Sequence, residues 1–129
     1  MPTVLIIEDS PTQVACVREL LRGLQVIRRS SDSTERCSPL LGQVDLVLIA
    51  LILVRQNGFE CGLRLRELGF TNIVLYSDCP EETDADWARA IGLQGFMQLP
   101  APTQVLRQQV QSLFNVSEQG GHDGKRWAS

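Results

Sequence analysis

The sequence alternates between short apolar runs and longer segments in which apolar residues recur at helical spacing. The run at residues 44–49 is almost entirely apolar and rich in β-branched residues, which predicts a strand buried on both faces at the centre of a parallel sheet. Four further runs predict the other strands: residues 3–7, 25–29, 72–76 and 95–98. Strands that alternate with helices predict a doubly wound α/β fold with a five-stranded parallel sheet and right-handed crossovers.

Turn and capping residues set the expected ends of the first two helices. Ser10 followed by Pro11 is a strong helix start, and Gly23 is a suitable stop. Residues 30–38 are polar and weakly patterned, and Pro39 would remove a hydrogen bond from a helix there. The second helix is therefore expected to be short or irregular.

The last three helices have clearer signals. The third is expected to follow the Asn57-Gly58 turn and to end at Gly69. The fourth is expected to start at Pro80, with Trp87 on its apolar side together with Ile91 and Leu93. Its first turn would then carry negative charges that favour the helix dipole: Glu81, Glu82 and Asp84. The fifth is expected to open at Pro102 with one apolar stripe: Leu106, Val110, Leu113 and Phe114.

The point just past the central strand has no residue that can carry chemistry. In open α/β sheets, active sites lie beyond the carboxyl ends of the central strands. Here that point is Ala50, followed by the apolar segment 51–54. Because the chain offers no nucleophile–base pair and no metal-ligand cluster, we do not expect an enzyme.

Composition indicates one domain and excludes several kinds of partner. The chain has 129 residues, 43% of them hydrophobic, and a net charge of −3, which suits a single domain with its own core. Lys and Arg are scattered, so neither nucleic acid nor an anionic membrane is an expected partner. No apolar run approaches the roughly 20 residues of a membrane span, and no signal peptide is recognisable, so we expect a cytoplasmic protein.

The composition changes near the end of the chain. From residue 116 onward the sequence becomes polar and rich in glycine, and it contains the one histidine, His122. Such a segment is typical of a flexible tail. We therefore expect a domain at residues 1–115 and a flexible C-terminal tail at residues 116–129.

Five motifs, taken in order, resemble the CheY-like receiver domains of two-component response regulators. They are Val-Leu-Ile-Ile-Glu-Asp-Ser-Pro at 4–11, Asp-Leu-Val-Leu at 45–48, Asn-Gly-Phe-Glu at 57–60, Tyr-Ser at 76–77 and Gly-Phe-Met-Gln-Leu-Pro at 95–100. The similarity covers about residues 3–115 and is closest to stand-alone chemotaxis receivers and to those that serve twitching motility and type IV pili. The resemblance implies a flavodoxin-like sheet with strand order 2-1-3-4-5 and suggests a cis peptide bond before Pro100.

The resemblance also implies which residues would form a phosphorylation site. In receivers, an acidic pair holds Mg²⁺, an aspartate accepts a phosphoryl group from a histidine kinase, and a hydroxyl and a lysine contact the phosphoryl oxygens. By position, the acidic pair is Glu8 and Asp9, and the hydroxyl belongs to Ser77. The acceptor position is Ala50 and the lysine position is Leu99, so the nucleophile and its cationic partner are both missing.

Physical chemistry makes this paired loss consistent. A methyl group cannot accept phosphoryl, and a lysine facing a vacated acid would be an uncompensated charge. Mg²⁺ requires several oxygen ligands, so at most a weakly held ion is expected at Glu8 and Asp9, and no other cofactor. Ser77 is then a turn or capping hydroxyl. We interpret the chain as a pseudo-receiver, which has the fold without the switch chemistry.

The expected function is a phosphorylation-independent protein interaction module in two-component or chemotaxis-like signalling. In receivers, the fourth helix, fifth strand and fifth helix dock partners and often form a homodimer; here these are residues 81–93, 95–98 and 102–114. Phe96 takes the place of the aromatic residue that changes rotamer in the family. Without a phosphoryl ligand, nothing drives that change, so one state should dominate.

Two alternatives stay open. The apolar surroundings of Ala50 and Leu99 would suit a sensor of small molecules or nucleotides, by analogy with other doubly wound folds. A residual phospho-switch is the other alternative.

Overall fold

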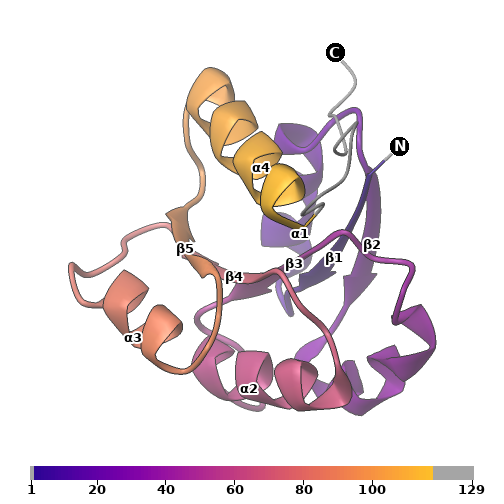
Figure 1. Cartoon of the computed structure of the whole chain (residues 1–129). Coiled ribbons are helices and arrows are strands. Elements are labelled where there is room, and N and C mark those ends of the chain that lie inside the picture. Colours follow the sequence, from indigo (N-terminus) through magenta and orange to yellow (C-terminus); the bar gives the residue numbers. More distant parts are fainter. Residues whose placement is uncertain (1, 118–129) are drawn as a thin grey trace.

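The computed structural model describes residues 2–117, and its five strands form one parallel sheet (Figure 1). The strands are β1 (Thr3–Ile7), β2 (Gln25–Arg29), β3 (Leu46–Ala50), β4 (Ile73–Ser77) and β5 (Gly95–Gln98). Their order is β2-β1-β3-β4-β5, which confirms the predicted doubly wound fold and the order 2-1-3-4-5. All neighbouring strands are parallel, so the carboxyl ends of the strands lie along one edge of the sheet.

Helices cover both faces of this sheet (Figure 1). One face carries α1 (Pro11–Leu20) and α4 (Thr103–Ser117), and the other carries η1 (Ser31–Leu40), α2 (Gly58–Leu68) and α3 (Asp84–Ala90). In β1, Val4 and Ile6 pack toward α1 and α4, whereas Leu5 and Ile7 pack toward the other layer. All four side chains are fully buried, which explains why the strand pattern is continuously apolar.

The predicted caps of α1 and α2 are in place. The Ser10 hydroxyl accepts a hydrogen bond from the Gln13 amide at 3.3 Å. The Asn57 side chain accepts one from the Glu60 amide at 2.9 Å, and Gly69 ends α2 with a φ of 111°. The second helix, η1, is a 3₁₀ helix that contains Pro39, which confirms the expected irregularity.

The start of α3 differs from the prediction. The helix begins at Asp84 rather than at Pro80, with Thr83 at its N-cap position. Residues 81–84 form a turn before it, in which the Asp84 carboxylate accepts a hydrogen bond from the Glu81 amide at 2.7 Å and the Asp84 amide donates to the Glu81 carbonyl at 3.1 Å. Glu81 and Glu82 therefore lie in the β4–α3 loop and outside the helix. Trp87, which was expected on the apolar side of this helix, is 62% exposed, whereas its neighbour Ala88 is buried.

The end of the described chain agrees with the predicted last helix. Leu106, Val110 and Phe114 are fully buried on one stripe of α4. The helix continues to Ser117, two residues into the segment expected to be a flexible tail, and residues 118–129 lie outside the described part. Within residues 2–117, no helix is long and apolar enough to span a membrane. The peptide bond between Leu99 and Pro100 is cis, as the resemblance suggested.

Candidate functional site

Four of the predicted site positions meet at the C-terminal edge of the sheet. Glu8 follows β1, Ala50 ends β3, Ser77 ends β4 and Leu99 follows β5. Together they line a hollow of about 350 Å³, which we call the edge hollow. Its remaining lining residues are Ser10, Gln13, Leu51, Ile52, Tyr76 and Asp78. The edge hollow therefore occupies the place where parallel α/β sheets carry their sites.

The floor of the edge hollow is hydrocarbon. Ala50 is 6% exposed and Leu99 is 4% exposed, and both belong to the core cluster under α1 and α4. Gly58, the first residue of α2, lies against the end of β3, where a Cβ atom would approach the Ala50 carbonyl oxygen to 2.6 Å. The side chain of Ala50, at the predicted acceptor position, is a single methyl group. It has no atom that can accept a phosphoryl group.

The Glu8 carboxylate is bonded to its own protein. Glu8 is buried, and its Oε1 accepts a hydrogen bond from the Tyr76 hydroxyl at 2.8 Å. Its Oε2 accepts one from the Ser10 amide at 3.2 Å. Burial and the adjacent Glu8 charge raise the pKa of Tyr76, so the phenol stays protonated and remains a donor. From the sequence, Tyr76 was named only as the residue before Ser77. No local pattern predicted its hydrogen bond to Glu8.

Asp9 does not line the edge hollow. Its Oδ1 accepts from the Ser31 amide at 2.8 Å, and its Oδ2 accepts from the Ser31 hydroxyl at 2.7 Å and the Val54 amide at 2.6 Å. Burial alone would raise the pKa of Asp9, but these hydrogen bonds, with the Arg28 charge, lower it below its ordinary value. Asp9 is therefore a charged acceptor that ties the start of η1 to the β3–α2 loop.

The acidic pair does not fit Mg²⁺ well. Mg²⁺ takes about six oxygen ligands in octahedral geometry. Glu8 and Asp9 are engaged by different hydrogen-bond donors, and Ala50 supplies no third carboxylate. Within the described residues, no group of three or more His, Cys, Asp or Glu side chains could hold a metal ion.

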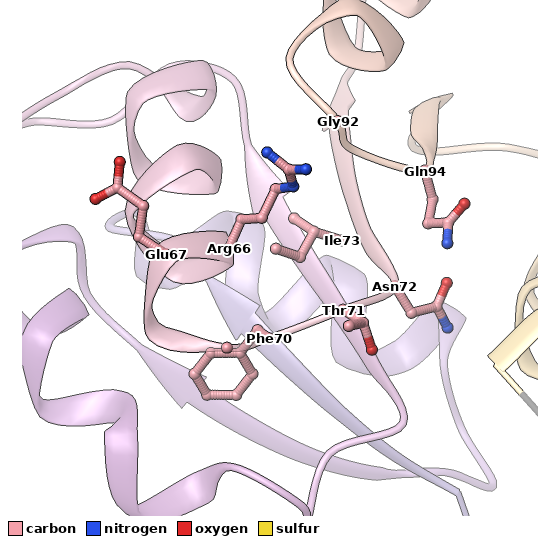
Figure 2. A pocket seen from close by; sticks show the side chains of 9 residues that line it. Arg66, Glu67, Phe70, Thr71, Asn72, Ile73, Gly92 and Gln94 are labelled. Atoms are coloured by element: carbon pink, nitrogen blue, oxygen red, sulfur yellow. The ribbon is translucent and has the colours of Figure 1, made fainter.

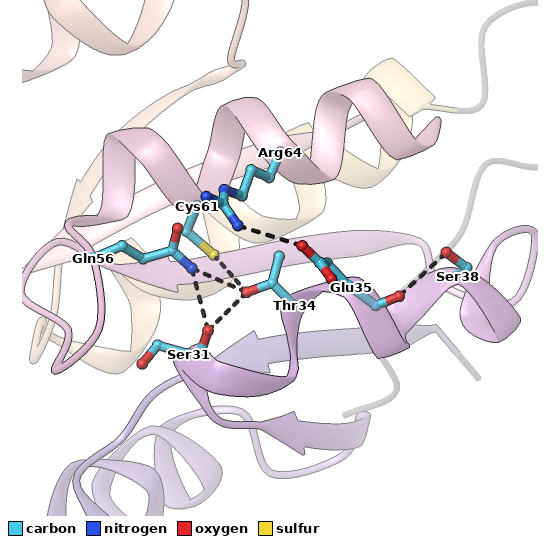
Figure 3. A network of polar contacts seen from close by, with 7 residues as sticks. All are labelled: Ser31, Thr34, Glu35, Ser38, Gln56, Cys61 and Arg64. Carbon is cyan, nitrogen blue, oxygen red and sulfur yellow. Dashed lines mark hydrogen bonds and ion pairs between the residues drawn. The ribbon is translucent and has the colours of Figure 1, made fainter.

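A polar network continues from Ser31 to α2 (Figure 3). The Gln56 amide donates to the Ser31 carbonyl at 3.2 Å and to the Thr34 hydroxyl at 3.1 Å, and that hydroxyl in turn donates to the Ser31 carbonyl. Thr34 also contacts the Cys61 sulfur at 3.6 Å. Burial raises the pKa of Cys61 to about 11, so this thiol is a packing group rather than a nucleophile. The network fixes η1 and the loop before α2 as one unit.

Ser77, the residue predicted to supply the hydroxyl, has a local partner. Its Oγ accepts a hydrogen bond from the Cys79 amide at 3.1 Å. This is a turn at the end of β4, which is the structural role expected for a serine before a helix. The side chain is half-buried on the wall of the edge hollow.

The predicted partner face is built by α3, β5 and α4, the fourth helix, fifth strand and fifth helix of the sequence prediction. Phe96 is half-buried there and lines a separate hollow of about 360 Å³. Met97 from β5, Arg89 from α3 and Leu113 from α4 line the same hollow. Trp87, also on α3, is 62% exposed.

A further hollow lies at the opposite edge of the sheet (Figure 2). It measures about 470 Å³, and Figure 2 shows Arg66 from α2 and Gln94 before β5 reaching toward it from two sides. Asn72 lines it, and its side-chain amide donates to the Asp45 and Leu113 carbonyls, which ties β3, β4 and α4 together. Its Oδ1 is buried and has no partner within the described part of the chain. None of the predicted site residues is there.

Solved receiver domains have the same fold. A response regulator receiver domain from Clostridium thermocellum aligns with a TM-score of 0.80 and 16% identity, covering 92% of this chain and 98% of the other. The Vibrio cholerae chemotaxis protein CheY4 aligns with a TM-score of 0.74 and 19% identity, covering 88% and 98%. A CheY-like receiver domain from Methanospirillum hungatei aligns with a TM-score of 0.76 and 14% identity, covering 94% and 99%.

At these identities the likeness establishes the fold alone. No protein-family model matches the chain, and no curated protein matches it in sequence. The protein therefore has the CheY-like receiver fold of response regulators, without a demonstrated phosphorylation site.

Proposed function

We propose that the protein is a cytoplasmic pseudo-receiver, an interaction module of two-component or chemotaxis-like signalling whose binding does not depend on phosphorylation. The observation that carries this proposal is the hydrocarbon floor of the edge hollow. The resemblance assigns the acceptor position to Ala50 and the lysine position to Leu99, and both residues line the edge hollow. Both side chains are built into the core, so the site favours packing over phosphoryl transfer.

The remaining polar residues of the site support the same conclusion. Glu8 is bonded to Tyr76, Asp9 to Ser31 and Val54, and Ser77 to the Cys79 amide. A ligand shifts a conformational equilibrium only by its different affinity for the two states. With no phosphoryl ligand to supply that difference, the domain remains in one dominant state.

The partner face that we propose is the one built by α3, β5 and α4. Arg107 is the only charged residue between Thr103 and Phe114, and depletion of charge is typical of the centre of protein interfaces. Exposed Trp87 and half-buried Phe96 add aromatic side chains, which are enriched among interface hot spots. The occupant is a signalling protein or a second copy of the chain, of the kind that chemotaxis and type IV pilus systems contain.

Phosphoryl incorporation tests the proposal. The native chain, Ala50→Asp and the double variant Ala50→Asp with Leu99→Lys are incubated with Mg²⁺ and acetyl phosphate, and intact masses are recorded. We expect no added phosphoryl mass on the native chain. Labelling of Ala50→Asp alone or of the double variant would mean that the remaining residues still support the chemistry. Labelling of the native chain would overturn the proposal and restore the residual phospho-switch.

A small-molecule sensor is the second candidate, because a hollow of about 350 Å³ lies within the size range of ligand pockets. Glu8 and Asp78 line this hollow, and none of the described lining residues is cationic. An anionic nucleotide would therefore meet carboxylates, which disfavours the nucleotide form of this candidate. A thermal-shift screen of neutral and cationic metabolites tests the other forms, and stabilisation by one of them would favour the sensor.

A further inference from the structure

An apolar loop projects beside the edge hollow. Residues 51–54 follow β3, and two of them, Ile52 and Val54, are 83% and 80% exposed. These are the two most exposed large hydrophobic side chains of the described chain. Leu53 between them is partly buried and packs against both core clusters. Neighbouring exposed apolar side chains of this kind mark interaction sites more often than isolated ones do.

The backbone of this apolar loop is fixed. The Leu51 amide donates to the Tyr76 carbonyl at 2.9 Å, and the Leu51 carbonyl accepts from the Gly58 amide at 2.7 Å. The Val54 amide donates to Asp9 at 2.6 Å. Because bonds hold both ends of the loop, Ile52 and Val54 are presented to solvent from a rigid support. A rigid support lowers the ordering cost of binding.

The apolar loop separates two hollows. The edge hollow lies on one side, and a second hollow of about 400 Å³ lies on the other, lined by residues 51–57 and Phe59. Leu51 and Ile52 line both. A bound chain can therefore place one side chain in the edge hollow and a neighbouring side chain on Ile52 and Val54.

The charge around the edge hollow selects the partner. Glu8 and Asp78 line it, and the stretch 78–86 beside it carries five acidic residues and no basic one: Asp78, Glu81, Glu82, Asp84 and Asp86. Glu81 and Glu82 are exposed because α3 begins only at Asp84. Within residues 2–117, no ion pair neutralises Asp78, Glu81 or Glu82. This side of the edge hollow is therefore complementary to a cation.

We propose that this edge docks a protein segment that presents a Lys or Arg side chain next to an apolar one. The cationic head faces Glu8 and Asp78, its alkyl stem lies on Ala50 and Leu99, and the apolar neighbour covers Ile52 and Val54. A small amine would fill the edge hollow but leave the apolar loop exposed, which favours a protein segment. The inference rests on the proposed function, because a protein segment can enter the edge hollow only if no phosphoryl group occupies it.

Amide NMR of the ¹⁵N-labelled full chain tests this inference. The probes are a blocked Gly-Leu-Lys-Leu-Gly peptide, the same peptide with Glu in place of Lys, and pentylamine. We expect the Lys peptide to shift the amides of Glu8, Leu51, Ile52, Ser77 and Asp78 in a saturable way. The Glu peptide should leave them unchanged, and pentylamine should bind at least tenfold more weakly than the Lys peptide, because it leaves Ile52 and Val54 uncovered.

Variants at exposed positions avoid loss of folding. Asp78→Lys should weaken the binding of the Lys peptide by about fivefold, which is the effect expected of a partly exposed charge interaction. Ile52→Ser should weaken this binding by a similar factor. Glu67→Lys, at the opposite edge of the sheet, makes the same change of net charge and should have no effect. If Asp78→Lys and Glu67→Lys weakened binding of the Lys peptide equally, the binding would reflect only the net charge of the protein. That result would overturn the inference.

The remaining outcomes separate this inference from the proposed function. No shift with the Lys peptide, on a chain that acetyl phosphate does not label, overturns the docking inference alone. If pentylamine binds as tightly as the peptide, the docking inference is overturned and the edge hollow is a small-molecule site. Labelling of the native chain by acetyl phosphate overturns the proposed function, whatever the peptides do.

Discussion

The acidic corner after β1 and the floor formed by β3 and β5 belong to the same edge of the sheet, yet they differ in how they depart from a receiver site. The corner keeps its acids, and each is held by hydrogen bonds from its own protein: Glu8 from Tyr76, and Asp9 from Ser31 and Val54. The floor has Ala50 and Leu99 at the positions that we propose for the acceptor and the lysine, and both are core residues. An acid at a predicted site position can therefore serve structure rather than metal binding, whereas the hydrocarbon floor offers no carboxylate that could accept a phosphoryl group.

The largest effect is expected from restoring charge to the floor. Ala50→Asp places a carboxylate at a 6% exposed position beside Glu8 and should lower the free energy of unfolding by about 3 kcal/mol. Leu99→Lys should lower it less, because carboxylates line the same hollow. In the double variant, the loss in the free energy of unfolding should be about 1–3 kcal/mol smaller than the sum of the losses of the two single variants, because the new charges pair. Urea unfolding of the three variants measures this. Strict additivity would contradict the placement of both residues on one floor.

The next effect separates Glu8 from a metal ligand. Glu8→Leu leaves the buried Tyr76 hydroxyl without an acceptor and should lower the free energy of unfolding by about 2 kcal/mol. Adding Tyr76→Phe removes the orphaned hydroxyl and should recover about 1 kcal/mol, because replacing both partners by apolar groups is nearly neutral. Thermal unfolding of the two single variants and the double variant measures this. A double variant no more stable than Glu8→Leu would mean that the Glu8–Tyr76 bond contributes little.

A smaller and more local effect is expected at Asp9. Asp9→Ala removes acceptors from Ser31 and Val54 and should lower the free energy of unfolding by about 1.5 kcal/mol. Amide exchange at Val54 should become faster, because its bond to Asp9 is lost, while exchange in β1 should follow only the global change. Glu67→Ala, an exposed acid at the other edge, is the matched control. Unchanged protection of Val54 would contradict the role given to Asp9.

The smallest effect is in the pH dependence of stability. The pKa of Asp9 is lower in the folded chain than its ordinary value of 3.8, so its charged form stabilises the fold above that pH. This stabilisation is lost as the pH falls from about 3.8 through the lowered folded pKa. Asp9→Asn should therefore show a shallower loss of stability in acid than the native chain when unfolding is followed across that window. If stability fell with pH equally steeply in both proteins, the hydrogen bonds of Asp9 would not favour its charged form in the folded chain.

The sequence was sufficient for the fold and for the positions of most site residues. Apolar runs and caps predicted the five strands and the starts of α1 and α2, and strand ends then brought Glu8, Ala50, Ser77 and Leu99 to one edge. The same logic did not foresee where Asp9 and Glu8 would find partners. Val54 is 45 residues from Asp9 and Tyr76 is 68 residues from Glu8, so neither bond follows from a local pattern.

The errors around α3 have a local cause. Proline at a first helical position and acids after it predicted a start at Pro80, but a turn between Glu81 and Asp84 precedes the helix, which starts four residues later. The helix that remains has seven residues, too few turns for apolar spacing to say which face is buried. Trp87 was therefore grouped with Ile91 and Leu93 on the apolar side of the helix, whereas Trp87 is exposed and Ala88 is buried.

The most direct test of the central claim is amide NMR of the native chain with Mg²⁺ and then with beryllofluoride, a mimic of the phosphoryl group. We expect the amide signals of Glu8, Ala50, Ser77 and Phe96 to keep their positions throughout, because the edge hollow offers no acceptor carboxylate and no lysine. Ala50→Asp with Leu99→Lys provides the matched comparison. Saturable shifts of these amides in the native chain would contradict the account and show that the edge still responds as a phosphorylation site.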